Sequence, residues 1–103
     1  MRTIRIHEDA ATEGEEAVGW YEKERPGLGA DFQVAVDAAL DLLQEELIPS
    51  TSVPRNAGKQ GLRQLVLTRF PYDVVLVERP DHTLVLAIAH QSRRPGYWKR
   101  RLR

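Results

Sequence analysis

The pattern of hydrophobic and polar positions opens with a short strand and two amphipathic helices. Residues 2–6 alternate isoleucine with arginine and threonine, which predicts a strand with one exposed face. Apolar residues then recur at helical spacing from Asp9, a candidate N-cap, to about Lys23. A second helical stripe runs from Leu28 to about Leu47. The proline- and glycine-rich turn between the stripes predicts an antiparallel helical hairpin.

The second half of the chain carries three strand-like runs. They are nearly continuous in Leu, Val and Ile at 62–69, 72–79 and 83–90. The connections between them contain proline and are so short that the runs must pair antiparallel. We therefore expect one α+β domain over residues 1–103, in the order β-α-α-β-β-β, with the helical hairpin packed on a mainly antiparallel sheet of about four strands. Residues 97–102 are expected to form a final helical turn.

The apolar stripe of the second helix is wider than one core face needs. Val34, Ala38, Leu40 and Leu42 lie beside the main stripe, so the pattern predicts that this helix is buried on more than one side. Residues 48–61 are rich in Pro, Ser, Gly and Asn and predict a loop, which is either functional or simply a long connection.

Charge is distributed unevenly along the chain, although the formal net charge is zero. Residues 1–48 hold twelve acidic and four basic side chains, a balance of −8, whereas residues 49–103 hold three acidic and eleven basic ones, a balance of +8. Such asymmetry either reflects separate partners for the two halves or arises only because helices favour glutamate. Without cysteine, a signal-peptide-like segment or an apolar run that could span a bilayer, the chain is expected to be cytoplasmic.

Candidate chemistry is concentrated after the last strand. The histidines lack metal-ligand spacing and no glycine-rich phosphate loop follows a strand, so we expect neither a metal nor a cofactor. Ser92 lies two residues from His90, but no nearby acid completes a catalytic triad. Cations and aromatics dominate the tail: Arg93, Arg94, Tyr97, Trp98, Lys99, Arg100, Arg101 and Arg103. Such a set can bind phosphates and stack bases, or Tyr97 and Trp98 can fold back and cover the sheet.

Two features of the sheet leave alternatives open. Strand alternation places the side chain of His90 on the face shared by Leu86 and Ile88, either as a proton carrier at the rim or as a hydrogen-bonded residue at the core edge. Arg63 and Arg69 bracket the first of the three long runs, where they could face a polyanion or pair with acids of the helices.

Several short motifs stand in a characteristic order along the chain. They are WYEKERPGLGADF at 20–32, LRQL at 62–65, RFPY at 69–72, and the run 85–90 followed by Arg-Arg-Pro at 93–95 and Tyr-Trp at 97–98. Together they resemble the ParE branch of the RelE/ParE toxin superfamily over nearly the whole chain. The joint occurrence of the first and last motifs is the most specific part of this resemblance.

The resemblance implies a toxin of a type II toxin–antitoxin pair, a class linked to plasmid stabilisation. Such a toxin forms a hetero-oligomeric complex with a cognate antitoxin, here ParD-like or similar. ParE-like members are associated with inhibition of DNA gyrase, whereas RelE-like members cleave messenger RNA on the ribosome. An inactive relative that serves as a binding module is the third alternative.

The residues that RelE-like nucleases use are only partly present. That resemblance implies basic residues on the first hairpin strand and an arginine after the tyrosine of the next, but here Asp73 follows Tyr72 and residues 64–67 contain no lysine. An acid beside the scissile phosphate would cost on the order of 1–4 kcal/mol, and about 1.4 kcal/mol changes a rate tenfold. We therefore expect a ParE-like, non-enzymatic function. If the chain is a nuclease, we expect its catalytic residues to be His90, Arg93, Arg94 and Tyr97, of which one of the two arginines and Tyr97 match that resemblance.

The expected interaction surfaces divide between the tail and the hairpin. The residues expected to contact the target are Arg93, Arg94, Tyr97, Trp98, Arg100 and Arg101, with direct binding of nucleic acid the less favoured use. The antitoxin is expected to dock as an amphipathic helix or an added strand. The residues expected to contact it are Trp20, Tyr21, Phe32, Val36, Leu40, Arg63 and Arg69.

Overall fold

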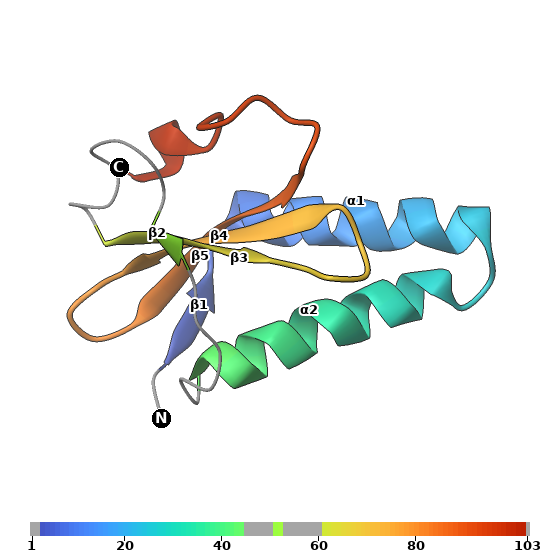
Figure 1. The fold of residues 1–103 in the computed structure, drawn as a ribbon, viewed down its shortest axis with the longest axis horizontal. Coiled ribbons are helices and arrows are strands. Elements are labelled where there is room, and N and C mark those ends of the chain that lie inside the picture. Colours follow the sequence, from blue (N-terminus) through green and yellow to red (C-terminus); the bar gives the residue numbers. More distant parts are fainter. Residues whose placement is uncertain (1–2, 45–50, 53–60, 103) are drawn as a thin grey trace.

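The computed structural model describes residues 3–44, 51–52 and 61–102, which follow the expected order of elements (Figure 1). The helices are α1 (Glu8–Glu24) and α2 (Leu28–Gln44), and the strands are β1 (Ile4–Ile6), β2 (Thr51–Ser52), β3 (Leu62–Val66), β4 (Tyr72–Glu78) and β5 (Thr83–His90). A short 3-10 helix, η2 (Lys99–Leu102), confirms the expected final helical turn. The predicted end of the second helix near Leu47 lies outside the described residues.

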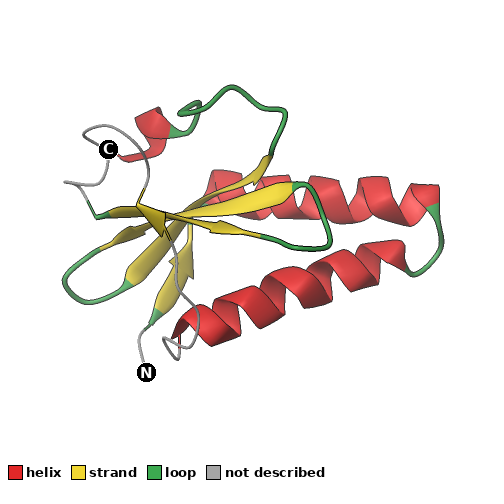
Figure 2. Ribbon diagram, viewed as in Figure 1, coloured by secondary structure: helices red, strands yellow, loops and turns green. Residues whose placement is uncertain are grey.

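One sheet contains all the described strands, in the order β1-β5-β4-β3-β2. Only β1 runs parallel to its neighbour, β5, and the other pairs are antiparallel. The sheet has one strand more than expected because Thr51 and Ser52, inside the predicted loop, pair with β3. Figure 2 shows the two helices side by side and the C-terminal segment returning over the sheet far from α2.

Two boundaries differ from the sequence pattern. Helix α1 is capped by His7 rather than Asp9, because the extended backbone of His7 lets its Nδ1 accept a hydrogen bond from the Asp9 N–H at 3.0 Å. Asp9 instead lies in the first turn, where the helix dipole stabilises a carboxylate. Strand β3 ends at Val66 rather than Arg69, because the Leu67 N–H already closes the turn onto the Tyr72 carbonyl oxygen at 3.0 Å.

The helical hairpin is closed by the side chain of Glu22. Its carboxylate accepts hydrogen bonds from the N–H groups of Gly27 at 2.9 Å and Gly29 at 3.1 Å, which caps the start of α2. Gly27 has a φ of 90°, which favours glycine. A Cβ atom on Gly29 would lie only 2.6 Å from the Val18 carbonyl oxygen, so the two helices approach closely here.

The sheet buries both of its faces. On the helix side, four rings pack with neighbouring centroids between 5.0 and 6.1 Å apart: Tyr21, Phe32, Phe70 and Tyr72. On the other side, Trp98 is 5% exposed and packs over Leu62, Val75 and Leu86, with Tyr97 and Leu102 beside it. Of the two alternatives for the tail aromatics, the structure has the one in which they cover the sheet.

A β-bulge at Leu86 changes the faces of strand β5. Leu76 pairs with Val85 while Val75 pairs with Ala87, so Leu86 is the extra residue. Leu86 therefore packs under the tail and Ile88 under the helices. The expectation that both share a face with His90 is wrong, because the bulge breaks strict alternation. The His90 ring packs edge-on against Tyr72, on the helix side.

Candidate functional site

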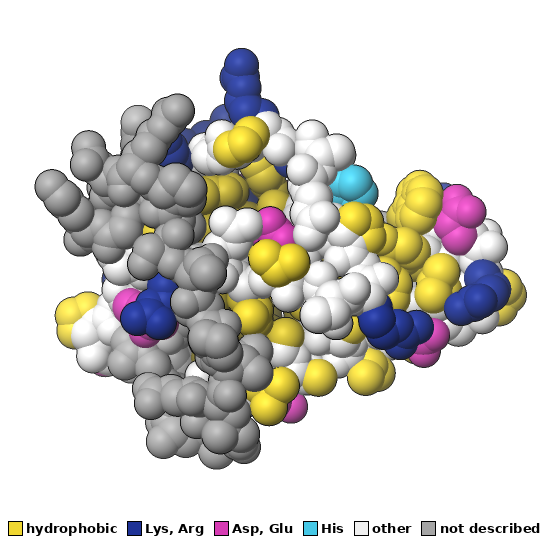
Figure 3. All heavy atoms as spheres, in the orientation of Figure 1, with side chains coloured by type: hydrophobic (Ala, Val, Ile, Leu, Met, Phe, Trp, Pro, Cys, Tyr) yellow, Lys and Arg dark blue, Asp and Glu magenta, His cyan; other side chains and the backbone are white. Residues whose placement is uncertain are grey.

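An apolar groove of about 390 Å³ lies between α2 and β3. It is lined by Asp31, Val34, Ala35, Ala38, Ala39, Leu42, Leu65, Val66, Leu67, Thr68 and Arg69. Three large side chains in it stay exposed, Val34 at 66%, Val66 at 54% and Leu42 at 39%. Hydrophobic side chains are accordingly visible over this region in Figure 3. Exposed apolar patches of this kind often mark sites of interaction with a partner.

The second apolar stripe of α2 is therefore exposed at the surface of the described chain. The expectation that this helix is buried on more than one side is wrong for the described chain, because Val34, Ala38 and Leu42 are exposed along it. Only the stripe that includes Phe32 and Val36 packs into the sheet. Helix α2 does carry two apolar stripes, but the spacing of apolar residues alone cannot show which of them is buried within this chain.

The residues expected to contact an antitoxin fall into two groups. Tyr21, Phe32 and Val36 are buried in the core, so their side chains are not available to a partner. Leu40 is half-buried against that core, and Trp20 is exposed on α1. Arg63 and Arg69 are exposed as well, and Arg69 forms an ion pair with Asp31 of α2 at 3.8 Å, beside the groove. Pairing with a helix acid is thus the alternative that holds for Arg69.

A second cleft, of about 290 Å³, lies under the tail. It brings together the four residues that a nuclease would use: His90, Arg93, Arg94 and Tyr97. Asp73 also lines it, with its carboxylate held by the side-chain amides of Gln64 and Gln91, the latter at 3.0 Å. The acid noted in the sequence thus shares the cleft with the cations and would oppose a bound phosphate.

His90 is held by the residue that follows the strand. Its Nδ1 accepts a hydrogen bond from the Ser92 N–H at 3.0 Å and lies 2.7 Å from Ser92 Oγ. Since Nδ1 is an acceptor, the neutral ring carries its proton on Nε2. Within the described ranges neither ring nitrogen is bonded to a carboxylate, so this pair lacks the orienting acid of a triad.

Tyr97 is a structural group rather than a free acid or base. Its hydroxyl donates to Glu13 Oε2 at 2.5 Å, and the guanidinium of Arg93 lies 4.1 Å from the ring centroid. Burial, together with the bond to Glu13, raises the pKa of Tyr97 far above its ordinary value. Tyr97 therefore stays protonated near neutral pH and cannot act there as a general base.

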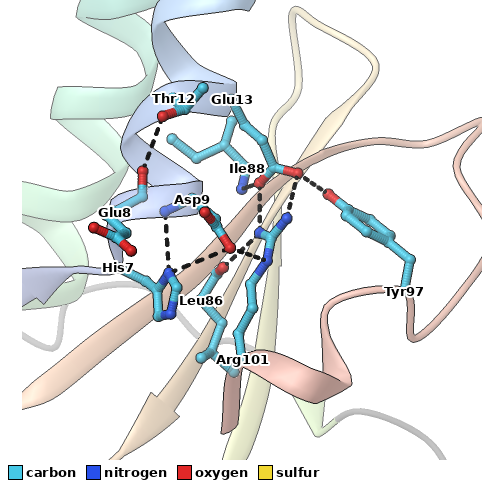
Figure 4. A network of polar contacts seen from close by, with 9 residues as sticks. All are labelled: His7, Glu8, Asp9, Thr12, Glu13, Leu86, Ile88, Tyr97 and Arg101. Atoms are coloured by element: carbon cyan, nitrogen blue, oxygen red, sulfur yellow. Dashed lines mark hydrogen bonds and ion pairs between the residues drawn. The ribbon is translucent and has the colours of Figure 1, made fainter. Parts of the chain in front are cut away.

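Glu13 on α1 and Arg101 on η2 form the best-bonded charged pair of the described chain, which we call the clamp (Figure 4). Arg101 Nη1 donates to Glu13 Oε1 at 2.8 Å, and Nη2 donates to Oε2 at 3.1 Å. Arg101 Nη1 also donates to the Leu86 carbonyl oxygen at 2.9 Å, and the Ile88 N–H donates to Glu13 Oε1 at 3.1 Å. The clamp thus joins a helix, the bulged strand and the tail.

The environment of the clamp keeps both groups charged. Burial by itself would raise the pKa of Glu13, but the hydrogen bonds from Arg101, Tyr97 and Ile88 outweigh it and leave that pKa below its ordinary value. The hydrogen bond to Glu13 raises the pKa of Arg101 further. Arg101 Nε has no hydrogen-bond partner and lies 3.6 Å from Asp9 Oδ2, which adds a second acid to the site.

The residues expected to contact a target are therefore also divided. Trp98 is in the core, and the side chain of Arg101 is only 9% exposed within the clamp. Arg93, Arg94 and Arg100 remain exposed, and Lys99 joins them. We call these four exposed cations of the tail the basic surface. Figure 3 shows Lys and Arg side chains at the top of the view, where the tail runs.

Glu13 was not among the residues predicted from the sequence, because its partner Arg101 lies at the far end of the chain.

The described residues contain no group of three or more His, Cys, Asp or Glu side chains placed to hold a metal ion. They also contain no helix that is long and apolar enough to cross a membrane.

A chain with a similar fold occurs among proteins of known structure. No protein-family model matches the chain, and no curated protein matches it. A solved structure described as "Chromosomal ParDE TA system from P. aeruginosa" contains a chain that is similar with a TM-score of 0.70 and 18% sequence identity, over 87% of this chain and 96% of that one. At this identity the likeness establishes the fold alone. The expected α+β architecture is thereby confirmed: the chain has the fold of a component of a ParDE toxin–antitoxin system.

Proposed function

We propose that the chain is the ParE-like toxin of a type II toxin–antitoxin module and acts in the cytoplasm. The observation that carries the proposal is the fold shared with a chain of the ParDE system over most of both chains. A fold alone does not define a function. The proposal therefore also draws on the two surfaces that the structure leaves open, the apolar groove and the basic surface.

The apolar groove between α2 and β3 suits the antitoxin. Its exposed apolar side chains would be covered by the apolar face of an amphipathic segment, as in helix-in-groove recognition. Asp31 and Arg69 form an ion pair beside the groove. They could contact basic and acidic side chains at the polar rim of a bound segment. We therefore revise the antitoxin surface to centre on Val34, Ala38 and Val66.

The basic surface suits the target, for which we propose DNA gyrase. None of its four cations lies within ion-pair distance of an acid in the described ranges, so their charge is available to an acidic protein surface. Complementary charge mainly raises association rates and specificity. Direct binding of nucleic acid remains the less favoured use of this surface, because Asp73 lies in the adjoining cleft.

The second candidate is a ribosome-dependent messenger RNA endonuclease. It is favoured by the cleft that gathers His90, Arg93, Arg94 and Tyr97. It is opposed by Asp73 in that cleft and by the Tyr97 hydroxyl, which is bonded to Glu13. Aligned hydrogen-bond donors stabilise a transition state in which negative charge grows, whereas a carboxylate beside that charge destabilises it.

The test starts with controlled expression of the chain in bacteria. A toxin arrests growth, and co-expression of the neighbouring reading frame restores it. Purified chain should inhibit gyrase supercoiling in vitro, and Arg93→Gln/Arg94→Gln should weaken that inhibition. Lys23→Gln/Arg25→Gln, which removes two exposed cations at the C-terminal end of α1 away from the tail, is the charge-matched control.

The outcomes separate the alternatives. Growth arrest with codon-linked cuts in translated transcripts, and with unaffected gyrase, would select the nuclease. Absence of growth arrest at verified expression of folded protein would select an inactive binding relative. Supercoiling that is unaffected at micromolar concentrations of the chain would reject gyrase as the target.

A further inference from the structure

Strand β5 is longer than its outer neighbour, which leaves part of its edge open. The pairing with β1 ends where Ile6 faces Val85, just before the bulge at Leu86. The Leu86 carbonyl group and the Ile88 N–H group therefore need partners other than β1. Arg101 supplies the donor for the first and Glu13 the acceptor for the second. The clamp thus completes the edge of the sheet in place of a strand.

The same carboxylate fastens the C-terminal tail, residues 91–102. Glu13 accepts four hydrogen bonds, from the Ile88 N–H, the Tyr97 hydroxyl and two nitrogens of Arg101. Two of these three partner residues belong to the tail, and Trp98, which lies between them in the sequence, packs on the sheet. The carboxylate of Glu13 therefore connects a helix, a strand and the tail through one group.

We propose that Glu13 is a positioning residue that locks the tail onto the sheet and thereby fixes the basic surface in one geometry. The use of that surface rests on the proposed function, but the position of the tail does not. Arg93 is tied to the clamp through Tyr97, whose ring it covers at 4.1 Å. Lys99 and Arg100 share η2 with Arg101. When the carboxylate loses its charge, these cations lose their common anchor.

Glu13→Gln is the sharpest variant because it keeps the shape of the side chain and removes only the charge. A neutral amide must point one N–H₂ group toward donors of Arg101 or Tyr97, which the carboxylate did not do. The bonds that hold the tail weaken, whereas the packing between α1, α2 and β4 is left in place. We therefore expect the tail to open locally while the rest of the fold stays closed.

Hydrogen exchange measures this separation directly. The reporters are the N–H groups of Lys99 and Arg101, which donate to Gly96 and Trp98 carbonyl oxygens at 3.0 and 2.9 Å. In Glu13→Gln their exchange should accelerate at least about tenfold, whereas the amide chemical shifts in the centre of β4 should keep their wild-type values. In a Trp20→Phe background Trp98 is the only tryptophan, and its quenching by acrylamide should rise in parallel.

Three further variants support the experiment. Glu16→Gln makes the same charge change at an exposed position on α1 and should leave tail exchange at the wild-type rate. Arg101→Lys keeps the positive charge but loses the paired geometry and should give intermediate exchange. If Glu13→Gln does not fold, Tyr97→Phe removes only the hydroxyl bond to Glu13 and should accelerate tail exchange to a smaller extent.

The outcomes are distinct from those for the proposed function. Tail exchange that stays at the wild-type rate in Glu13→Gln and in Tyr97→Phe would overturn the proposal, as would amide chemical-shift changes in the centre of β4 as large as those in the tail. If the wild-type chain inhibits gyrase, the inhibitory concentration of Glu13→Gln should rise at least about tenfold, a change equal to about 1.4 kcal/mol. An open tail with unchanged inhibition would overturn the link to the basic surface. A wild-type chain that never arrests growth rejects the proposed function and leaves the exchange result standing.

Discussion

The carboxylate of Glu13 and the guanidinium of Arg101 meet through two hydrogen bonds, of 2.8 and 3.1 Å, although 88 residues separate them in the sequence. Glu13 lies on the first helix and Arg101 on the last helical turn. Their pairing places the start and the end of the chain against the same bulged strand. The geometry of the C-terminal tail therefore depends on a residue far from it in the sequence.

Breaking this pair from one side should be costly for stability. Arg101→Met removes the partner of a nearly buried carboxylate, so we expect the free energy of unfolding to fall by about 3 kcal/mol. The double variant Glu13→Gln/Arg101→Met leaves no unpaired charge within the clamp and should lose less than the sum of the two single variants. Urea unfolding of the four proteins measures this coupling, and simple additivity would contradict it. Arg100→Met, next along η2 and exposed, should stay within about 0.5 kcal/mol of wild type.

Acid should weaken the fold through Glu13. The pKa of Glu13 is lower in the folded chain than its ordinary value of 4.5, so the unfolded chain binds the proton more readily. The contribution of Glu13 to stability is then present above about pH 4.5 and is lost as the pH falls through the lower, folded-state pKa. Unfolding midpoints between pH 3 and 7 should fall more steeply toward acid in wild type than in Glu13→Gln. Parallel curves would show that Glu13 carries no such linkage.

The two tryptophans should differ sharply in their effect on stability. Trp98 is 5% exposed and fills the cluster under the tail, so Trp98→Ala should cost about 3–5 kcal/mol. Trp20 is 57% exposed, so Trp20→Ala should cost less than about 1 kcal/mol. Thermal unfolding compares the two, and similar losses would mean that Trp98 contributes little to the core.

The apolar groove should bind the antitoxin through its middle. Ala38→Asp places a charge among apolar side chains and should weaken antitoxin binding at least about tenfold with little change in stability. Ala30→Asp is the matched control, because Ala30 is also exposed on α2 but does not line the groove. Titration calorimetry with the product of the neighbouring reading frame gives both dissociation constants. Equal affinities for the two variants would move the antitoxin away from the groove.

Two helical glycines offer a test of the hairpin geometry. Gly29→Ala would bring a Cβ within 2.6 Å of the Val18 carbonyl oxygen and should destabilise the fold by about 1–3 kcal/mol. A Cβ on Gly19 would meet no atom within 4 Å, so Gly19→Ala should stabilise the fold by about 0.5–1 kcal/mol. Unfolding midpoints that move in the same direction would contradict the close approach of α1 and α2.

Local patterns in the sequence were enough to determine every described element except β2, and the order of those elements. Helical spacing placed α1 and α2, apolar runs placed β3, β4 and β5, and the short connections imposed antiparallel pairing. These features depend on neighbours within a few residues, so they can be recognised without coordinates. The resemblance of the ordered motifs to ParE-like toxins likewise anticipated the fold.

Only the tertiary structure decided which side chains belong to the core and which to a surface. The pattern could not show that Phe32 packs inside while Val34 stays exposed, because both fit an apolar stripe. The bulge at Leu86 places that side chain on the face opposite Ile88 and His90, which strict alternation along β5 could not show. The pairing of Glu13 with Arg101 was also invisible, since a contact across nearly the whole chain exists only after the sheet, the hairpin and the tail have come together.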